Sequence, residues 1–229
     1  MCVYWLEQKQ ADVPGELNWL SPFEAARLNT LRIPKRRGDW LLGRWTAKRA
    51  LARHWNLPAG LDALRSVEIR PAPSGAPEVF RADGPGDVAI SISHRDGVAA
   101  CAIGPRGMAL GCDLEIAEPR SDTFVIDYFT EDERKLIAQV PAANRQWLVA
   151  LLWSAKESLF KALHSGLRLD TRSALIIPSW NGTSPQWSAL RARADKGQMF
   201  PGWWQRTDRR VRTIVTAPAA PPPEVWHLA

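Results

Sequence analysis

The chain has 229 residues, a formal net charge of +6, and 45% hydrophobic and 24% charged residues. This length fits either one large domain or two lobes of about a hundred residues each. Because no stretch approaches the ~20 consecutive apolar residues of a membrane span, and the N-terminal residues lack a signal-peptide pattern, we expect a cytoplasmic protein. The three cysteines have no disulfide or metal-binding spacing, and the positive charge predicts an anionic partner.

Taken in chain order, the first half of the sequence alternates between short apolar runs and two helical patterns. Ser21 and Glu24 have the spacing of a capping box, in which each side chain bonds the other's backbone N–H, so a helix begins at Pro22. Asp96 and Gly97 separate two apolar runs and favour a hairpin turn. We expect a strand at 3–6, helices at 22–31 and 39–55, and strands at 66–70, 78–80, 88–93 and 98–103.

The segment 104–107 is the predicted boundary between two lobes, because Gly and Pro interrupt the pattern there. After it we expect a strand at 108–116, helices at 130–139 and 144–163, and strands at 174–177, 186–191 and 211–216. Both halves thus run from a strand through helices to further strands. This order predicts an α+β fold of two similar, duplicated lobes, residues 1–105 and 106–229, although the sequence shows no clear internal repeat.

Two carboxylates lie on one face of the strand predicted at 108–116. Because side chains alternate along a strand, Asp113 and Glu115 point to the same side. Two like charges this close repel each other, so the pair favours a bound cation. Mg²⁺ fits, since it takes one or two carboxylates and fills its octahedron with water and substrate phosphates. The alternative for this pair by itself is a solvated polar strand edge.

The helix predicted at 144–163 carries charged residues within an otherwise apolar sequence. At 3.6 residues per turn, Trp153, Glu157 and Lys161 lie on one face, with Lys156 beside them. Leucines and alanines form a separate stripe that faces the core. Taken alone, the pattern equally fits an exposed Glu–Lys pair one turn apart, which contributes about 0.3–0.5 kcal/mol.

Candidate anion-binding residues gather in the first half of the chain. Ser93 and His94 end a predicted strand, where a histidine can donate a hydrogen bond to a phosphate oxygen. A capping or partly buried histidine is the alternative. Basic residues are concentrated between Arg32 and Arg53, and this concentration implies a local anion site.

Together these motifs resemble the phosphopantetheinyl transferase superfamily, in particular its longer, two-lobed type named after the activator of surfactin synthetase. Residues 110–115 resemble the family's (V/I)-G-(I/V)-D-(I/V)-E motif, and residues 153–161 match W-x-x-K-E-(S/A)-x-x-K at every fixed position. The family's intermediate F-x-x-x-E and upstream S-H also agree, at Phe129 with Glu133 and at Ser93 with His94. The resemblance spans roughly residues 20–180.

The resemblance implies a role for each motif residue. The Mg²⁺ would be held by Asp113, Glu115 and Glu157, and Mn²⁺ would accept the same oxygen ligands. Coenzyme A, the co-substrate, would be bound by Arg44, Ser93, His94, Lys156 and Lys161. The sequence leaves open which basic side chain takes the 3′-phosphate, among Lys35, Arg36, Arg37 and Arg44. The family's G-K-P loop reads Gly75-Ala76-Pro77 here, so its lysine is missing.

The implied reaction transfers 4′-phosphopantetheine from coenzyme A to a serine of an apo acyl or peptidyl carrier protein, with release of 3′,5′-adenosine bisphosphate. Lys161 would neutralise charge on the phosphoryl group, and Glu157 is the candidate base. Carrier proteins of this system are typically acidic, so the positive charge would speed the encounter. The resemblance implies a monomer with its active site in the cleft between two lobes, and neither nucleic acid nor membrane as partner.

Two other functions fit parts of the pattern. A metal-dependent nuclease or phosphodiesterase would also use paired carboxylates near a Glu and a Lys, and would bind nucleic acid with a steep salt dependence. A basic, non-enzymatic module would bind nucleic acid by stacking Trp and Arg on bases. The sequence lacks the usual carboxylate-x-lysine strand motif of the first. Three carboxylates placed for one cation argue against the second.

Overall fold

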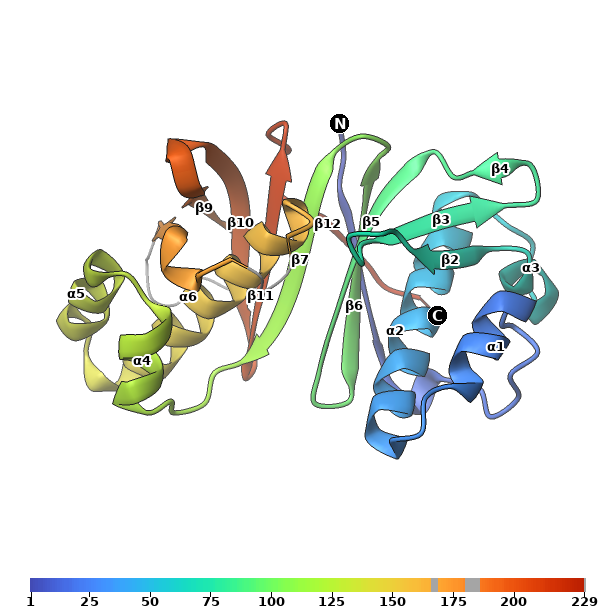
Figure 1. Cartoon of the computed structure of the whole chain (residues 1–229), viewed down its shortest axis with the longest axis horizontal. Coiled ribbons are helices and arrows are strands. Elements are labelled where there is room, and N and C mark those ends of the chain that lie inside the picture. The colour runs from blue at the N-terminus through green and yellow to red at the C-terminus, as the bar shows by residue number, and fades with distance from the viewer. Residues whose placement is uncertain (166–168, 180–185, 229) are drawn as a thin grey trace. The chain divides into compact units, whose positions relative to one another are not determined.

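The computed structural model describes residues 1–165, 169–179 and 186–228, and it divides the chain into two compact units (Figure 1). The first unit comprises Met1–Gly107 and the residues from Glu224 onward, and the second comprises Met108–Pro223. In each unit a 21-residue helix packs against a largely antiparallel sheet. The α+β class predicted from the sequence is confirmed.

The first unit contains two sheets, with strand orders β12-β1-β6-β5 and β2-β3-β4. β3 also contacts β5, and α2 packs on β1, β5 and β6. Its elements are β1 (Tyr4–Lys9), η1 (Gln10–Asp12), α1 (Pro22–Asn29), α2 (Pro34–His54), α3 (Leu61–Arg65), β2 (Glu68–Pro71), β3 (Pro77–Arg81), β4 (Gly84–Pro85), β5 (Val88–Arg95), β6 (Val98–Pro105) and β12 (Glu224–Trp226).

The second unit contains one sheet with strand order β7-β11-β10-β9-β8, which α6 covers. Its elements are β7 (Ala109–Ile116), α4 (Asp122–Tyr128), α5 (Glu131–Gln139), α6 (Ala142–Ala162), η3 (Thr171–Ser173), β8 (Leu175–Pro178), β9 (Ser188–Arg193), η4 (Asp195–Gly197), β10 (Met199–Thr207) and β11 (Arg210–Ala217). No helix in the described part of the chain is long and apolar enough to cross a membrane.

The two units repeat one arrangement in chain order. In each unit, a first strand is followed by helices, and the longest of these helices packs on the sheet. Further strands follow the helices in the chain, and one of them, β6 or β11, pairs with the first strand. The strands β1, β6 and β5 correspond to β7, β11 and β10, and β2 and β3 correspond to β8 and β9. The prediction of two similar lobes is confirmed.

A capping box opens a short helix at the same place in each unit. Ser21 and Glu24 bond each other's backbone N–H at the start of α1, with N···O distances of 3.0 and 3.2 Å. Thr130 and Glu133 do the same at the start of α5, at 2.8 and 3.2 Å. The first box was predicted from the spacing of Ser21 and Glu24, and Thr130 and Glu133 have the same spacing.

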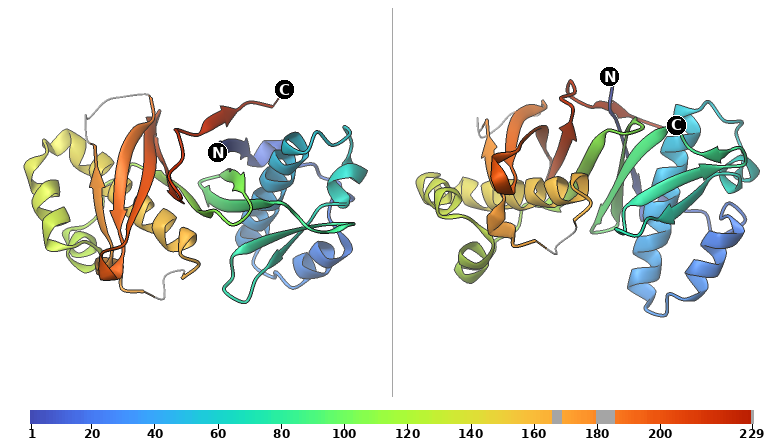
Figure 2. Two further views of the ribbon diagram at one scale, coloured as in Figure 1. Left: turned by 90° about the horizontal axis from the view of Figure 1, so that it is seen from above. Right: turned by 45° about the horizontal axis from the view of Figure 1, so that its top comes forward.

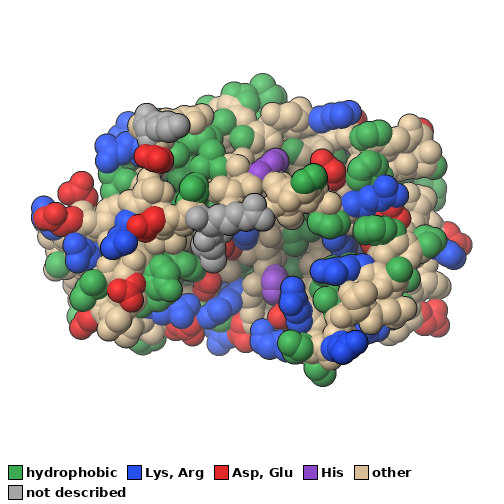
Figure 3. Space-filling view, in the orientation of Figure 1, with side chains coloured by type: hydrophobic (Ala, Val, Ile, Leu, Met, Phe, Trp, Pro, Cys, Tyr) green, Lys and Arg blue, Asp and Glu red, His purple; other side chains and the backbone are tan. Residues whose placement is uncertain are grey.

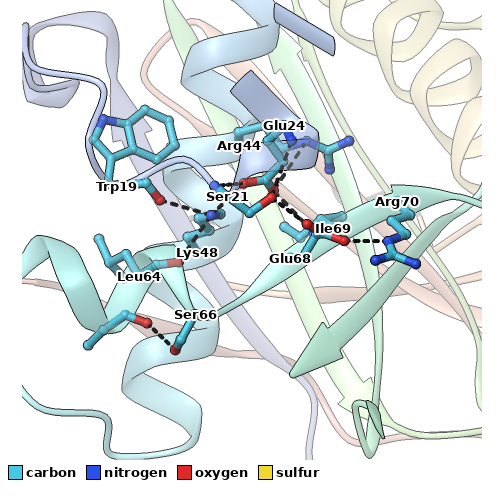
Figure 4. A network of polar contacts seen from close by, with 11 residues as sticks. Trp19, Ser21, Glu24, Arg44, Lys48, Leu64, Ser66, Glu68, Ile69 and Arg70 are labelled. Atoms are coloured by element: carbon cyan, nitrogen blue, oxygen red, sulfur yellow. Dashed lines mark hydrogen bonds and ion pairs between the residues drawn. The ribbon is translucent and has the colours of Figure 1, made fainter. Parts of the chain in front are cut away.

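Each capping glutamate also forms an ion pair with a lysine of the long helix. Glu24 pairs with Lys48 (Figure 4) and Glu133 pairs with Lys156, and all four side chains are 0% exposed. Each lysine donates two further hydrogen bonds to backbone carbonyls, and each glutamate accepts one from the backbone of a following strand. This full set of partners is what makes two buried charges tolerable.

The matching lysines reveal an internal repeat that the sequence analysis missed. Trp45-Thr46-Ala47-Lys48 in α2 repeats as Trp153-Ser154-Ala155-Lys156 in α6, at the same position of each helix. The residues around these four differ in polarity, which hid the repeat in the sequence. The conclusion that no clear repeat exists was therefore wrong.

Several short or irregular elements of the structure were not predicted, among them α4, β10 and β12. α4 is only seven residues long, and β10 contains Pro201 and Gly202, which ordinarily argue against a strand. The third is β12, which follows a Pro-rich segment and pairs in parallel with β1 (Figure 2). We expected residues 106–229 to form the second lobe, but the residues from Glu224 onward belong to the first unit.

Candidate active site

The second unit brings α6 close against β7, and a glycine permits this approach. A Cβ atom at Gly111 would lie 1.8 Å from the carbonyl oxygen of Ser158, so a larger residue cannot fit without moving the helix. The approach places Asp113 of β7 within hydrogen-bond distance of Ser154 and Lys161 of α6. The two motifs singled out in the sequence therefore meet at one site.

Asp113 is held at both carboxylate oxygens and is 5% exposed. Lys161 Nζ donates to its Oδ1 at 2.8 Å, and Ser154 Oγ donates to its Oδ2 at 2.8 Å. Lys161 Nζ also donates to the carbonyl oxygen of Cys112 at 2.9 Å, and its side chain is 28% exposed. Lys161 is thus a half-buried partner of β7 and not a member of an exposed surface pair.

Three buried hydroxyl groups beneath Asp113 were missed by sequence reasoning. The Oγ atoms of Ser154 and Ser158 each lie 2.8 Å from Thr213 Oγ1 on β11, and Ser158 Oγ also donates to the Thr213 carbonyl. All three residues are 0% exposed. Two serines one turn apart in an otherwise apolar helix were the available signal, because buried hydroxyls need partners. The network fixes the orientation of the Asp113 carboxylate.

Glu157 lies one helical turn before Lys161 and is repelled electrostatically by two other carboxylates, those of Asp113 and Glu115. Burial is the main cause that raises the pKa of Glu157 from 4.5 to about 7. The charges of Asp113 and Glu115 also raise it, while Lys161 lowers it. For Lys161, burial is the largest single cause and lowers the pKa, but Asp113, Cys112 and Glu157 together outweigh burial, so the pKa is raised. Lys161 therefore stays charged at neutral pH, while Glu157 titrates near it.

The donor chemistry of this cluster fits a hard cation such as Mg²⁺. Carboxylate oxygens are its preferred ligands, and the raised pKa of Glu157 reflects in part the repulsion between the three negative charges. Each carboxylate oxygen has two lone pairs, so Asp113 keeps acceptor capacity beside its bonds to Lys161 and Ser154. A cation would relieve the repulsion that Lys161 alone offsets only in part.

The arrangement of the side chains, however, does not form a closed ligand set. Among the residues that the structure describes, no group of three or more His, Cys, Asp or Glu is positioned to hold a metal ion. The Glu115 side chain is 13% exposed and lies 3.7 Å from Arg120. The assignment of Asp113, Glu115 and Glu157 as metal ligands therefore stays a prediction, and it requires their side chains to draw together.

Lys156 requires a correction, because the sequence analysis placed it among the coenzyme A ligands. Its side chain is 0% exposed and forms an ion pair with Glu133 at 2.8 Å. Its ammonium group also donates to the carbonyl oxygens of Thr171 and Ala174, at 2.7 and 2.6 Å. An ammonium group has three N–H donors, and these three partners occupy them all. Lys156 thus has a structural role, because it connects α6 to Glu133 of α5 and to the backbone at Thr171 and Ala174.

The candidate residues of the first unit differ in accessibility. The His94 side chain is 49% exposed, and its Nε2 lies 3.6 Å from Asp39 Oδ2. Ser93 is 5% exposed, so the two adjacent side chains point to opposite faces of β5 and do not present themselves to one ligand together. The Arg44 side chain is 13% exposed, and its Nε lies 4.0 Å from Glu24 Oε1. Their roles toward coenzyme A stay predictions.

The basic stretch Lys35-Arg36-Arg37 lies in the first turn of α2, and all three residues are largely exposed or half-buried. Lys and Arg side chains gather over this end of α2 in the space-filling view (Figure 3). Arg37 donates to the Leu28 carbonyl at 2.8 Å, and Lys35 pairs with Asp39 at 3.0 Å. This end of the helix is therefore rich in positive charge that solvent and ligands can reach.

Comparison with known proteins links the second unit to one family. A model of the 4′-phosphopantetheinyl transferase superfamily matches residues 109–196, the stretch that contains β7 and α6. The holo-[acyl-carrier-protein] synthase of Enterococcus faecalis is 32% identical over 84 residues, which cover 37% of this chain and 71% of that protein. The corresponding synthase of Streptococcus thermophilus is 36% identical over 75 residues, covering 33% of this chain and 62% of that protein.

A further relative matches along almost the whole chain. The 4′-phosphopantetheinyl transferase HetI of Nostoc sp. is 24% identical over 228 residues, which cover 97% of this chain and 89% of that protein. Both units of this chain are therefore represented in HetI, whereas the matches to the two synthases cover about a third of this chain.

Proposed function

The chain belongs to the 4′-phosphopantetheinyl transferase superfamily, and from this premise we propose that it transfers 4′-phosphopantetheine from coenzyme A to a serine of an apo acyl or peptidyl carrier protein. The serine hydroxyl would attack the β-phosphate of coenzyme A, and 3′,5′-adenosine bisphosphate would leave. The observation that supports this most is the meeting of Asp113, Glu157 and Lys161 where β7 and α6 pack together. The family assignment leaves the nuclease and the nucleic-acid-binding alternatives without support.

The carboxylates Asp113, Glu115 and Glu157 would hold the metal ion in this proposal. A bound Mg²⁺ would supply positive charge to the diphosphate oxygens of coenzyme A. The hydroxyl network of Ser154, Ser158 and Thr213 keeps Asp113 oriented toward α6, and this rigidity lowers the cost of arranging the site for each turnover.

Glu157 is the proposed base that accepts the proton of the attacking serine. A base works best when its pKa lies near the operating pH, and the pKa of Glu157 is raised to about 7. Lys161 would stabilise negative charge that collects on the phosphoryl oxygens, since it is charged, half-buried and fixed by Asp113. The two residues thus divide proton transfer and charge stabilisation between them.

The first unit would supply the rest of the coenzyme A site. His94 is exposed enough to contact a phosphate, and the basic first turn of α2 is placed to receive another anionic group. We propose that these groups contribute to the coenzyme A site of a monomeric, cytoplasmic enzyme. The net charge of +6 supports recognition of an acidic carrier protein.

The test is to incubate the protein with coenzyme A, Mg²⁺ and a panel of apo acyl and peptidyl carrier proteins, and to measure each carrier by intact mass spectrometry. At least one carrier should gain the mass of a single phosphopantetheine group at its serine. A carrier variant with that serine changed to alanine is the control and should gain nothing. If no carrier of any class gained mass, the proposed activity would be refuted.

A further inference from the structure

The first unit contains a cavity of about 650 Å³ that involves none of the residues proposed above for catalysis. It lies between the C-terminal half of α2 and the strand β12, which brings the end of the chain beside this helix (Figure 2). Residues of its wall that matter here are Tyr4, Arg49, Arg53, His54, Glu224 and Trp226. The volume is in the usual range for a small-molecule site.

Two arginines give the cavity a positive wall. Arg49 is half-buried, and within the described part of the chain its buried Nε has no hydrogen-bond partner. Such an atom loses hydration without compensation, which is unfavourable unless a ligand or water bonds to it. Arg53 is exposed and lies over the Trp226 ring at 4.9 Å. Arg53 lies in the last turn of α2, where its charge interacts favourably with the negative end of the helix dipole. Arg49 lies before the last turn, so the helix dipole does not explain the presence of this arginine.

Aromatic rings form a second wall of the same cavity. The rings of Tyr4 and Trp226 are stacked, with centroids 4.3 Å apart and an angle of 23° between the planes. The His54 ring lies 5.8 Å from Tyr4 and 6.5 Å from Trp226. Flat aromatic surfaces beside guanidinium groups favour a ligand that combines a planar ring with a negative charge. The carboxylate of Glu224 also lines the cavity and opposes such a ligand.

The internal repeat places this cavity at the counterpart of the candidate active site. When Lys48 is aligned with Lys156, Arg49 takes the position of Glu157 and Arg53 takes the position of Lys161. β1, which contributes Tyr4, corresponds to β7, which contributes Asp113. In the first unit two cations thus stand on the helix where the second unit has Glu157 and Lys161. A junction suited to a metal cation in one unit is suited to an anion in the other.

We propose that this cavity is a second binding site, which takes a small aromatic anion. The planar ring packs beside Tyr4 and Trp226, and Arg49 and Arg53 bind its negative group. Both an aryl carboxylate and a nucleotide have this chemistry. The site lies wholly within the first unit and does not depend on the transferase activity.

The test is isothermal titration of the full-length protein with 2-naphthoate, in parallel with its neutral analogue 2-naphthamide and with acetate, which lacks the ring. Naphthoate should bind, naphthamide should bind at least ~10-fold more weakly because it loses charge-assisted bonds, and acetate should show no binding. Adenosine 5′-monophosphate is titrated in the same way. If it displaces naphthoate and binds more tightly, the ligand is a nucleotide, and otherwise it is an aryl carboxylate.

Variants locate the binding. Arg53→Ala should weaken naphthoate binding at least ~5-fold, and Glu224→Gln should strengthen it about 3-fold, because it removes an opposing charge. Arg65→Ala is the matched control, since it removes an exposed arginine of the same unit outside the cavity. Arg53 is exposed, so its replacement leaves the core intact, and a thermal melt checks this. Absence of binding by both probes, or binding that Arg53→Ala leaves unchanged, overturns the proposal.

Discussion

Lys161 is the side chain that connects the two motifs of the second unit. Its ammonium group contacts the Asp113 carboxylate and the Cys112 carbonyl, both on β7. The side chain is 28% exposed, so it reaches solvent from a position that β7 fixes. A charged donor held in this way needs little reorganisation to stabilise negative charge in a transition state.

We therefore expect Lys161→Ala to lower turnover at saturating coenzyme A by ~10²-fold or more, the scale of losing one such contact. Lys161→Arg should restore little, because a planar guanidinium differs from an ammonium group in shape and reach. Lys135→Ala, which removes an exposed lysine of α5, is the control. Steady-state transfer to an apo-carrier measures all three. Normal turnover of Lys161→Ala would leave this lysine with a structural role alone.

Glu157 makes stability depend on pH when no metal is bound. Its pKa is 4.5 in an ordinary environment and about 7 in the folded protein, so the folded state favours the protonated form. This stabilisation is fully present below pH 4.5 and is lost as the pH rises through about 7. In EDTA, the melting temperature of the wild type should therefore fall relative to Glu157→Gln between pH 5 and pH 8. Parallel curves for the two proteins would show that Glu157 does not titrate in this range.

For the individual site residues, the sequence predicted the right residue types but not all of the groups that these side chains contact. Asp113 and Lys161 were chosen from motifs, and the structure joins them. Lys156 belongs to the same motif yet is buried against Glu133, because the motif spacing does not reveal which backbone carbonyls surround a side chain. The network of Ser154 and Thr213 joins residues 59 apart in sequence, so no local pattern indicates it.

The long helices α2 and α6 each carry a buried lysine that ties a capping glutamate to the core. Lys48 and Glu24 do so in the first unit, and Lys156 and Glu133 in the second. The same glutamates cap α1 and α5 and bond to the strands β2 and β8. One ion pair in each unit thus joins a short helix, a long helix and a strand.

Removal of one partner from such a buried pair should destabilise the protein strongly. Lys156→Ala leaves Glu133 as a buried, uncompensated charge, and we expect a loss of about 3–5 kcal/mol in the free energy of unfolding. Lys135→Ala removes an exposed ion pair and should leave the free energy of unfolding nearly unchanged. Urea unfolding monitored by circular dichroism compares the two. A loss below about 1 kcal/mol for Lys156→Ala would contradict this role.

Elements with regular periodicity were predicted well, whereas those with unusual residues were missed. The predicted helix at 144–163 is α6 to within two residues at its start. β10 was missed because Pro201 and Gly202 usually interrupt strands. The structure explains the glycine, since a Cβ atom at Gly202 would lie 2.4 Å from the Ile214 carbonyl oxygen of β11. Close approach between neighbouring strands is a tertiary property that a local pattern does not contain.

On the scale of the whole chain, the first unit is completed by the C-terminal residues. After β11 the chain returns to the first unit, where β12 pairs in parallel with β1 from Tyr4 to Leu6. Trp226 is 8% exposed and stacks on Tyr4. A Pro-rich tail gave no sign of this return, because a three-residue parallel strand is specified by its partner and not by its own sequence.

Deletion of the residues from Glu224 onward should therefore loosen the first unit selectively. Without β12, the backbone of β1 loses the hydrogen bonds of one edge, including that from Glu224 N to the Val3 carbonyl. We expect faster amide hydrogen exchange in β1 and unchanged exchange in β7, measured by mass spectrometry of peptides. Equal protection of β1 in both proteins would show that β12 contributes nothing to the stability of this edge.

The most direct test of the account is holo-carrier formation as a function of Mg²⁺ concentration, for the wild type and for Asp113→Ala, Glu115→Ala and Glu157→Ala. The account predicts transfer by the wild type that EDTA abolishes. Each variant should lose transfer. Glu115→Ala and Glu157→Ala should keep their fold, because removing a carboxylate from a repelling cluster relieves repulsion, whereas Asp113→Ala removes the partner of Lys161 and Ser154 and should also lower stability. If two of the three variants turned over near normally at low Mg²⁺, the junction of β7 and α6 would not be the metal site.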